Sequence, residues 1–193
     1  MPFIGNKPTA VPLTSADIQD GTIALADLSA TGTKDSTTFL RGDNTFASAG
    51  GTNTPAWKVK RGSAQSGVAN ATETTIICDS EEFDTANAYN TSTGIFTVPS
   101  GQGGKYMIGG AFRTNASGTG TRVIIYINVG GTNVHQYNNP QGSDGEASSG
   151  IHAIVSLTAG QEVKLRVYQN TGGAVNLESS EGKTYFYGYK IIE

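Results

Sequence analysis

The strongest indication of the fold is a run of alternating apolar residues between Arg122 and Val129. One side of an extended strand would carry four β-branched side chains, Val123, Ile125, Ile127 and Val129. Gly130 and Gly131 follow at once, and glycines accept the positive φ angles of a two-residue hairpin turn. The pattern predicts a strand, a tight turn and a returning strand.

Similar short strands recur from Trp57 to the C-terminus. Residues 151–157 and 163–167 alternate in the same way, and an aromatic strand runs from Tyr185 to Ile192. The sequence holds 26 glycines and only 15% charged residues, a composition that favours strands and tight turns over helices. We therefore predict an all-β protein whose residues 53–193 form a jelly-roll β-sandwich.

Several of these strands are apolar on both faces. Ile124 and Tyr126 lie opposite the valine and isoleucine face described above, and Phe186 accompanies the final tyrosines. A sandwich strand in a monomer usually keeps one face polar, so the second face needs a cover, and a second copy of the chain is the simplest one. We predict a homo-oligomer whose contact includes Tyr126, Tyr185, Tyr187, Tyr189 and Ile191.

The N-terminal quarter has a different composition. Residues 1–52 are polar and lack sustained periodicity, and prolines disfavour a helix in the first dozen residues. We expect an arm over residues 1–25, an extended connector over residues 26–52 and the sandwich head over residues 53–193. The start resembles no secretory signal, and no apolar stretch is long enough to insert into a membrane.

Charge and cysteine content exclude several classes of function. The net charge is −3 without a basic block, so we expect no nucleic acid partner. Cys78 is the single cysteine, which excludes an intramolecular disulfide and a cysteine-based metal site. It shares strand parity with Ile76, and we predict a buried, inert thiol.

No group of residues predicts catalysis or a cofactor. Asp79, Glu81, Glu82 and Asp84 form the densest acidic cluster, for which a solvated turn is favoured over a calcium site. His135 and His152 have no neighbouring metal ligand in the sequence. We predict a non-enzymatic protein without cofactor or metal, although the sequence leaves open a carboxylate pair assembled by the fold, as in glycosidases.

Three sequence blocks resemble the globular heads of complement and tumour necrosis factor-like proteins. They are Tyr89 with Gly94-Ile95-Phe96-Thr97-Val98-Pro99 and Gly104-Lys105-Tyr106; Leu157 with Gly160-Gln161-Glu162-Val163-Lys164-Leu165; and Thr184-Tyr185-Phe186-Tyr187-Gly188-Tyr189. The resemblance covers about residues 56–193, in the family's order. It implies a ten-strand jelly roll that forms tight trimers, with the aromatic terminal strand near the three-fold axis.

The N-terminal region resembles a segment of tail-fibre proteins from tailed phages, most familiar in marine and cyanobacterial phages. The similar stretches are Ala16–Ile23, Asp27–Thr33 and Thr37–Phe46. The tripeptide Arg41-Gly42-Asp43, which also occurs in integrin ligands, lies inside this segment and is interpreted as a turn. In such proteins this segment precedes a C-terminal binding head.

The two resemblances together imply a short trimeric virion fibre, assembled in the host bacterial cytoplasm. We expect its arm to bind other virion structural proteins through Phe3, Ile4, Pro8, Val11, Leu13 and Ile18, and its head to bind a host surface glycan or protein. Candidate receptor contacts are the turns at residues 115–120 and 138–146. The alternatives are a trimeric capsid decoration protein, a carbohydrate-depolymerising enzyme and a soluble lectin-like or cytokine-like module.

Overall fold

The computed structural model describes residues 24, 29–48, 52–114, 122–139, 146–179 and 182–192. The chain divides into two compact units, Met1–Gly51 and Thr52–Glu193, which we call the N-terminal unit and the head. The turn at residues 115–120 lies outside the described residues. So do all the expected anchor residues, which are Phe3, Ile4, Pro8, Val11, Leu13 and Ile18.

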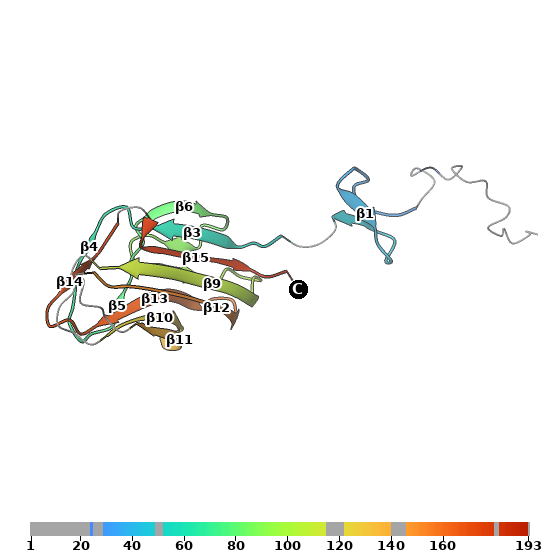
Figure 1. Ribbon diagram of the computed structural model, residues 1–193. Coiled ribbons are helices and arrows are strands. Elements are labelled where there is room, and N and C mark those ends of the chain that lie inside the picture. Colours follow the sequence, from blue (N-terminus) through green and yellow to red (C-terminus); the bar gives the residue numbers. More distant parts are fainter. Residues whose placement is uncertain are drawn as a thin grey trace, which may run out of the picture. The chain divides into compact units, whose positions relative to one another are not determined.

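The head is a sandwich of two antiparallel sheets (Figure 1). The first sheet has the strand order β12 (Ser148–Leu157), β9 (Gly104–Arg113), β15 (Tyr185–Lys190), β3 (Ala56–Lys60) and β6 (Ser80–Asp84). The second sheet has the order β11 (Thr132–Asn139), β10 (Val123–Val129), β13 (Glu162–Gln169), β8 (Ile95–Thr97) and β7 (Tyr89–Asn90), with β5 (Thr74–Thr75) also paired to β13. A separate pair joins β14 (Val175–Leu177) to β4 (Gln65–Val68).

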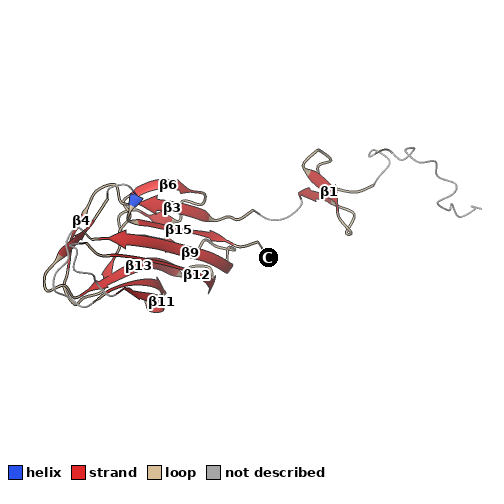
Figure 2. Cartoon of the chain, in the orientation of Figure 1, coloured by secondary structure: helices blue, strands red, loops and turns tan. Residues whose placement is uncertain are grey.

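Strands and loops make up almost all of the head in Figure 2, and no α-helix occurs among the described residues. The all-β prediction is therefore confirmed. Within this described part of the chain, no helix is long and apolar enough to cross a membrane.

The core between the sheets is centred on aromatic side chains. Trp57 is fully buried, and its ring stacks on Phe96 with 3.7 Å between ring centroids, while Phe186 meets it edge-on at 5.5 Å. Gly188 faces the same tryptophan, and a side chain at that position would collide with the indole ring. Alternation along each strand thus sends one set of side chains into this core and the other set outward.

Strand β10 confirms the alternating pattern that predicted it. All four β-branched residues of its inner face are buried, and Gly130 and Gly131 adopt φ angles of +56° and +90° in the turn to β11. The apolar faces of residues 151–157 and 163–167 also pack on the core, as expected.

The outer face of β10 differs from our expectation. Ile124 and Tyr126 are only 5% and 7% exposed in the single chain, so they need no partner to leave water. Arg166 lies beside Tyr126 in the register, and the Arg166 guanidinium holds Glu73 at 2.6 Å. Residues from distant parts of the chain therefore enclose this face. The expectation that the outer face of β10 needs a second copy as its cover was wrong. An interface role for Tyr126 stays a prediction.

The N-terminal unit contains a hairpin where we expected an extended connector. Strand β1 (Thr38–Leu40) pairs with β2 (Phe46–Ser48), and the Arg41-Gly42-Asp43 tripeptide lies in the turn between them, as interpreted. The carboxylates of Asp35 and Asp43 each accept hydrogen bonds from the backbone N–H and the hydroxyl of the threonine two residues later. These local bonds favour turns, and they allow the chain to reverse direction at the polar residues 35–37 and 43–45.

Candidate functional site

The outer side of the last strand carries a row of tyrosines. In β15, Phe186 and Gly188 point into the core, so Tyr185, Tyr187 and Tyr189 point outward. The rings of Tyr185 and Tyr187 stack with their centroids 6.2 Å apart. Burial, and then the neighbouring tyrosines, raise the pKa of Tyr187, which keeps its hydroxyl neutral.

The neighbouring strand β9 has no side chain at the position next to Tyr187. Tyr187 is paired in register with Gly109, and the tyrosine hydroxyl lies 2.6 Å from where a β-carbon of residue 109 would be. The ring therefore lies across the glycine. In the next row, Tyr189, Met107 and Ile154 are aligned on three adjacent strands. We call the outward residues Phe83, Met107, Ile154, Tyr185, Tyr187 and Tyr189 the tyrosine face.

A groove of about 580 Å³ runs along the β6 side of the tyrosine face. Its lining includes the tyrosines, Phe83, Glu82 and the two lysines of β3. Lys58 and Lys60 both bind Glu82, at 2.8 and 3.3 Å, and these bonds hold the pKa of Glu82 below its usual value. The charges that line the groove are thus paired within the chain.

The tyrosine face collects three of the five predicted interface residues. Tyr126 lies on the other sheet, as described above. Ile191 lies beyond the end of β15, half-buried, and its backbone N–H donates to the carbonyl of Lys105. Sequence reasoning missed Phe83 and Ile154, because their place beside the tyrosines depends on strand pairings between distant segments.

Two further exposed apolar side chains lie on opposite faces of the edge strand β11, since Tyr137 is paired with Ile125 and Val134 directly precedes the His135 that is paired with Ile127. Tyr137 is 56% exposed and Val134 is exposed too, although both sit on a sandwich strand. His135 of β11 and His152 of β12 line one shallow hollow between the two edge strands. Their sequence positions gave no sign of this proximity.

The acidic cluster does not converge on a common point. Asp79 accepts from the Gly62 N–H and the Ser63 hydroxyl, both at 2.6 Å, while Asp84 accepts from backbone N–H groups of residues 86, 88 and 89. Glu82 is held by the two lysines. Among the described residues no group of three potential metal ligands is formed. These carboxylates therefore serve as local structural acceptors.

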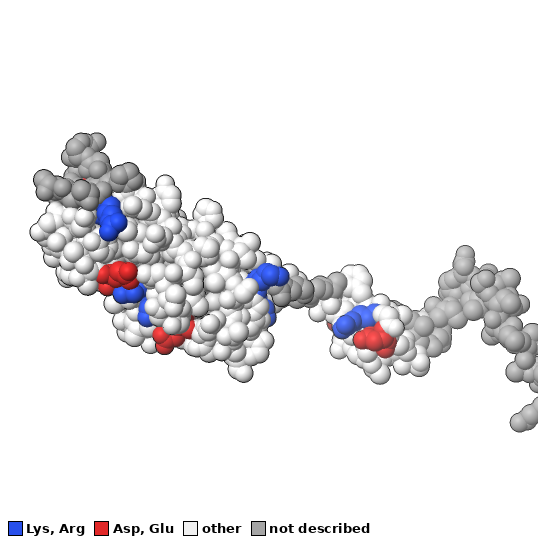
Figure 3. Space-filling model, turned by 90° about the horizontal axis from the view of Figure 1, so that it is seen from below, with Lys and Arg blue, Asp and Glu red and all other residues white. Residues whose placement is uncertain are grey.

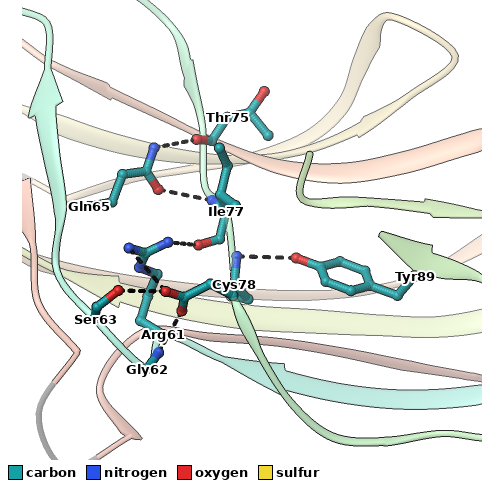
Figure 4. A network of polar contacts seen from close by, with 9 residues as sticks. Arg61, Gly62, Ser63, Gln65, Thr75, Ile77, Cys78 and Tyr89 are labelled. Carbon is teal, nitrogen blue, oxygen red and sulfur yellow. Dashed lines mark hydrogen bonds and ion pairs between the residues drawn. The ribbon is translucent and has the colours of Figure 1, made fainter. Parts of the chain in front are cut away.

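Figure 4 shows the polar network around Arg61 at the edge of the core, to which Asp79 belongs through its bonds to Gly62 and Ser63. Arg61 is almost fully buried, donates to the carbonyl of Ile77 and lies 3.7 Å from Asp79. Gln65 donates to the Thr75 carbonyl and accepts from the Ile77 N–H. The network ties residues 61–65 to residues 75–79.

Cys78 lies on the core side of this network. It is fully buried, and its backbone N–H donates to the hydroxyl of Tyr89 at 3.1 Å. Burial raises the pKa of the Cys78 thiol to about 12. The prediction of a buried cysteine is confirmed, and a thiol with so high a pKa is a poor nucleophile.

Replacing Asp79 by alanine is expected to destabilise the head by about 2 kcal/mol at neutral pH, because two charge-assisted hydrogen bonds are lost and Arg61 stays buried without its counter-ion. Although burial raises the pKa of Asp79, the bonds from Ser63, Gly62 and Arg61 together lower it. The stabilisation is therefore complete above the carboxyl's ordinary pKa and is lost as the pH falls through the lower folded value.

Urea unfolding of both proteins at neutral pH and near pH 3 measures this effect. The difference between them should shrink in acid, and Glu81→Ala, an exposed neighbour on β6, should change little at either pH. Equal stabilities of wild type and Asp79→Ala at neutral pH would contradict the role given to this carboxylate.

The outer surface of the second sheet carries few charges. Figure 3 views the head from the side of β10 and β11 and shows small groups of both signs on a mostly uncharged surface. The Arg122 guanidinium lies over the Tyr168 ring at 5.2 Å, and Arg166 is neutralised by Glu73. On the face shown, nothing favours a polyanion.

Comparisons with known proteins agree with this architecture. Residues 56–191 match the C1q domain model. The globular domain of zebrafish complement 1qA superposes with a TM-score of 0.53 at 15% identity, covering 72% of this chain and 98% of the other. Eiger TNF from S. frugiperda superposes with a TM-score of 0.55 at 14% identity, covering 70% of this chain and 91% of the other. Murine APRIL at pH 5.0 superposes with a TM-score of 0.52 at 12% identity, covering 70% of this chain and 98% of the other. No curated protein sequence matches significantly. The predicted jelly roll is confirmed.

Proposed function

The chain belongs to the C1q domain family, and from this premise we propose that its head is a homotrimeric, non-enzymatic binding module. The tyrosine face carries the proposal. It presents three tyrosines, Met107 and Ile154 on the open side of a sheet, with Phe83 beyond Lys58, and exposed apolar surface of this kind marks a protein contact. Aromatic residues are also enriched in subunit interfaces.

A closed ring of three subunits requires two different surfaces on each subunit. The tyrosine face supplies one of them. The exposed Tyr137 of the edge strand β11 is the candidate for the other. The two lysines that line the groove are already paired with Glu82, so a subunit that enters the groove buries no charge without a counter-ion.

We place this trimer in a virion fibre because the N-terminal sequence resembles tail-fibre segments of tailed phages. Residues 1–25 dock on other virion structural proteins, and the head projects toward the host surface, where it binds a glycan or a protein. The fibre assembles in the bacterial cytoplasm. Three identical heads raise the avidity for a repeated ligand even when each contact is weak.

Light scattering of the purified full chain tests the trimer. The expected mass is three times 20.0 kDa over a wide concentration range. A monomeric mass at micromolar concentration would remove the subunit contact on which the proposal depends.

Imaging of phage particles labelled with an antibody to the head tests the location. Label at the tail or baseplate supports the fibre, whereas label over the capsid three-fold positions identifies a decoration protein. Particles that carry no label contradict a virion role altogether. Sustained release of reducing ends from host polysaccharide would contradict the non-enzymatic assignment.

A further inference from the structure

The described residues of the N-terminal hairpin make regular hydrogen bonds but bury few apolar side chains. Register pairs join Leu40 to Phe46 and Phe39 to Ala47, and a bridge joins Thr31 to Thr45. Among the described residues of this unit, only the small side chain of Ala30 is a buried apolar one. Isolated two-stranded sheets of this size are marginal in water, so the hairpin needs further contacts.

The exposed apolar side chains lie on both sides of the hairpin. Phe39 is 60% exposed and Leu40 is 47% exposed. Successive residues of a strand point to opposite faces, so Phe39 with Ala47 forms one face and Leu40 with Phe46 forms the other. One copy thus offers two different apolar surfaces.

The described residues of the hairpin carry equal numbers of positive and negative charges. Its described residues carry Lys34 and Arg41 against Asp35 and Asp43, which gives no net charge. Arg41 lies 3.9 Å from Asp43, and the Lys34 ammonium lies over the Phe46 ring at 5.8 Å. The net charge of the hairpin therefore does not oppose the association of like copies.

We infer that three copies of this hairpin pack in a ring, with the Phe39 face of one copy against the Leu40 face of the next. The inference rests on the trimeric head proposed above, which holds three hairpins at high effective concentration. Two unlike faces per copy are what a closed three-fold contact requires, whereas an isologous dimer would bring like faces together. The occupant of the apolar surface is thus the same segment of the neighbouring chain.

Cysteine cross-linking in the full chain tests the arrangement. The double variant Leu40→Cys/Ala47→Cys, which keeps Phe39 and Phe46 and puts one cysteine on each face, should form covalent trimers under mild oxidation, while each single variant should remain largely unlinked. Cys78 is buried and does not interfere. Efficient dimer formation by a single variant would mean that like faces meet, and this would overturn the ring.

Light scattering of the reduced double variant distinguishes failure of the hairpin ring from failure of the trimeric head. A trimeric mass without cross-linking would overturn this inference and leave the trimeric head intact. A monomeric mass of wild type and variant alike would refute the trimeric head, and with it the ring.

Limited proteolysis provides a second measurement. Its reference is the wild-type protein, in which Phe39 and Leu40 are both present. Trypsin cleavage after Arg41 should be about tenfold faster in Phe39→Asp than in wild type, because the charge opens the packed hairpins. Ser36→Asp, an exposed turn position in the same hairpin, is the matched control and should be cleaved at the wild-type rate. Equal rates in Phe39→Asp and wild type would contradict the packing.

Discussion

Replacing both Tyr187 and Tyr189 by aspartate is expected to convert the proposed trimer into folded monomers. Each substitution places a carboxylate in the centre of an apolar contact, and an unpaired buried charge costs about 3–5 kcal/mol. Two such charges in each subunit weaken association by more than about a thousandfold. Light scattering at micromolar concentration measures the change directly.

The fold of this variant should be unaffected, because both side chains point away from the core. The matched control is Tyr187→Phe/Tyr189→Phe, which keeps the apolar area and should remain trimeric. Circular dichroism confirms that both variants are folded. A stable trimer of the aspartate variant would show that the subunits meet through another surface.

Replacing Trp57 by alanine is expected to destabilise the head by about 3–5 kcal/mol, the range for truncating a large buried aromatic. The indole is fully buried and contacts Phe96 and Phe186 from the two sheets. Its removal leaves a cavity between the sheets that Gly188, which has no side chain, cannot fill. Thermal and urea unfolding followed by far-ultraviolet circular dichroism measure the loss.

Fluorescence is unsuitable for that experiment, since Trp57 is the only tryptophan. Trp57→Phe is the matched control: it keeps a stacked ring and should cost clearly less than the alanine variant. A cost below about 1 kcal/mol for Trp57→Ala would mean that the core collapses around the site, contrary to the rigid packing described here.

Local patterns in the sequence predicted much of the head. The alternation in β10 depends on backbone geometry alone, and glycines 130 and 131 fix the turn that follows. The buried state of Cys78 followed from its parity with Ile76 in the same way. Such features require no knowledge of what a strand pairs with.

The parts that were missed depend on pairings between distant segments. Glu73 covers the outer face of β10 only because β5 pairs with β13. Phe83 joins the tyrosine face only because β6 pairs with β3, and a bulge in that pairing brings Glu82 to Lys58 and Lys60. The hairpin of the N-terminal unit depends on aspartate caps that resemble ordinary polar linker sequence. Periodicity carries no information on such contacts.

The pairing of β3 with β15 also determines how the head responds to mechanical load. These strands begin and end the sandwich, they run antiparallel, and the N–H of Lys190 donates to the carbonyl of Pro55, so both ends of the head lie side by side. Tension between the two ends would peel the strands apart one bond at a time, which needs little force. In the fibre proposed above, a pull on the N-terminal end against a ligand held at the far end would instead load all the bonds of β3 in shear.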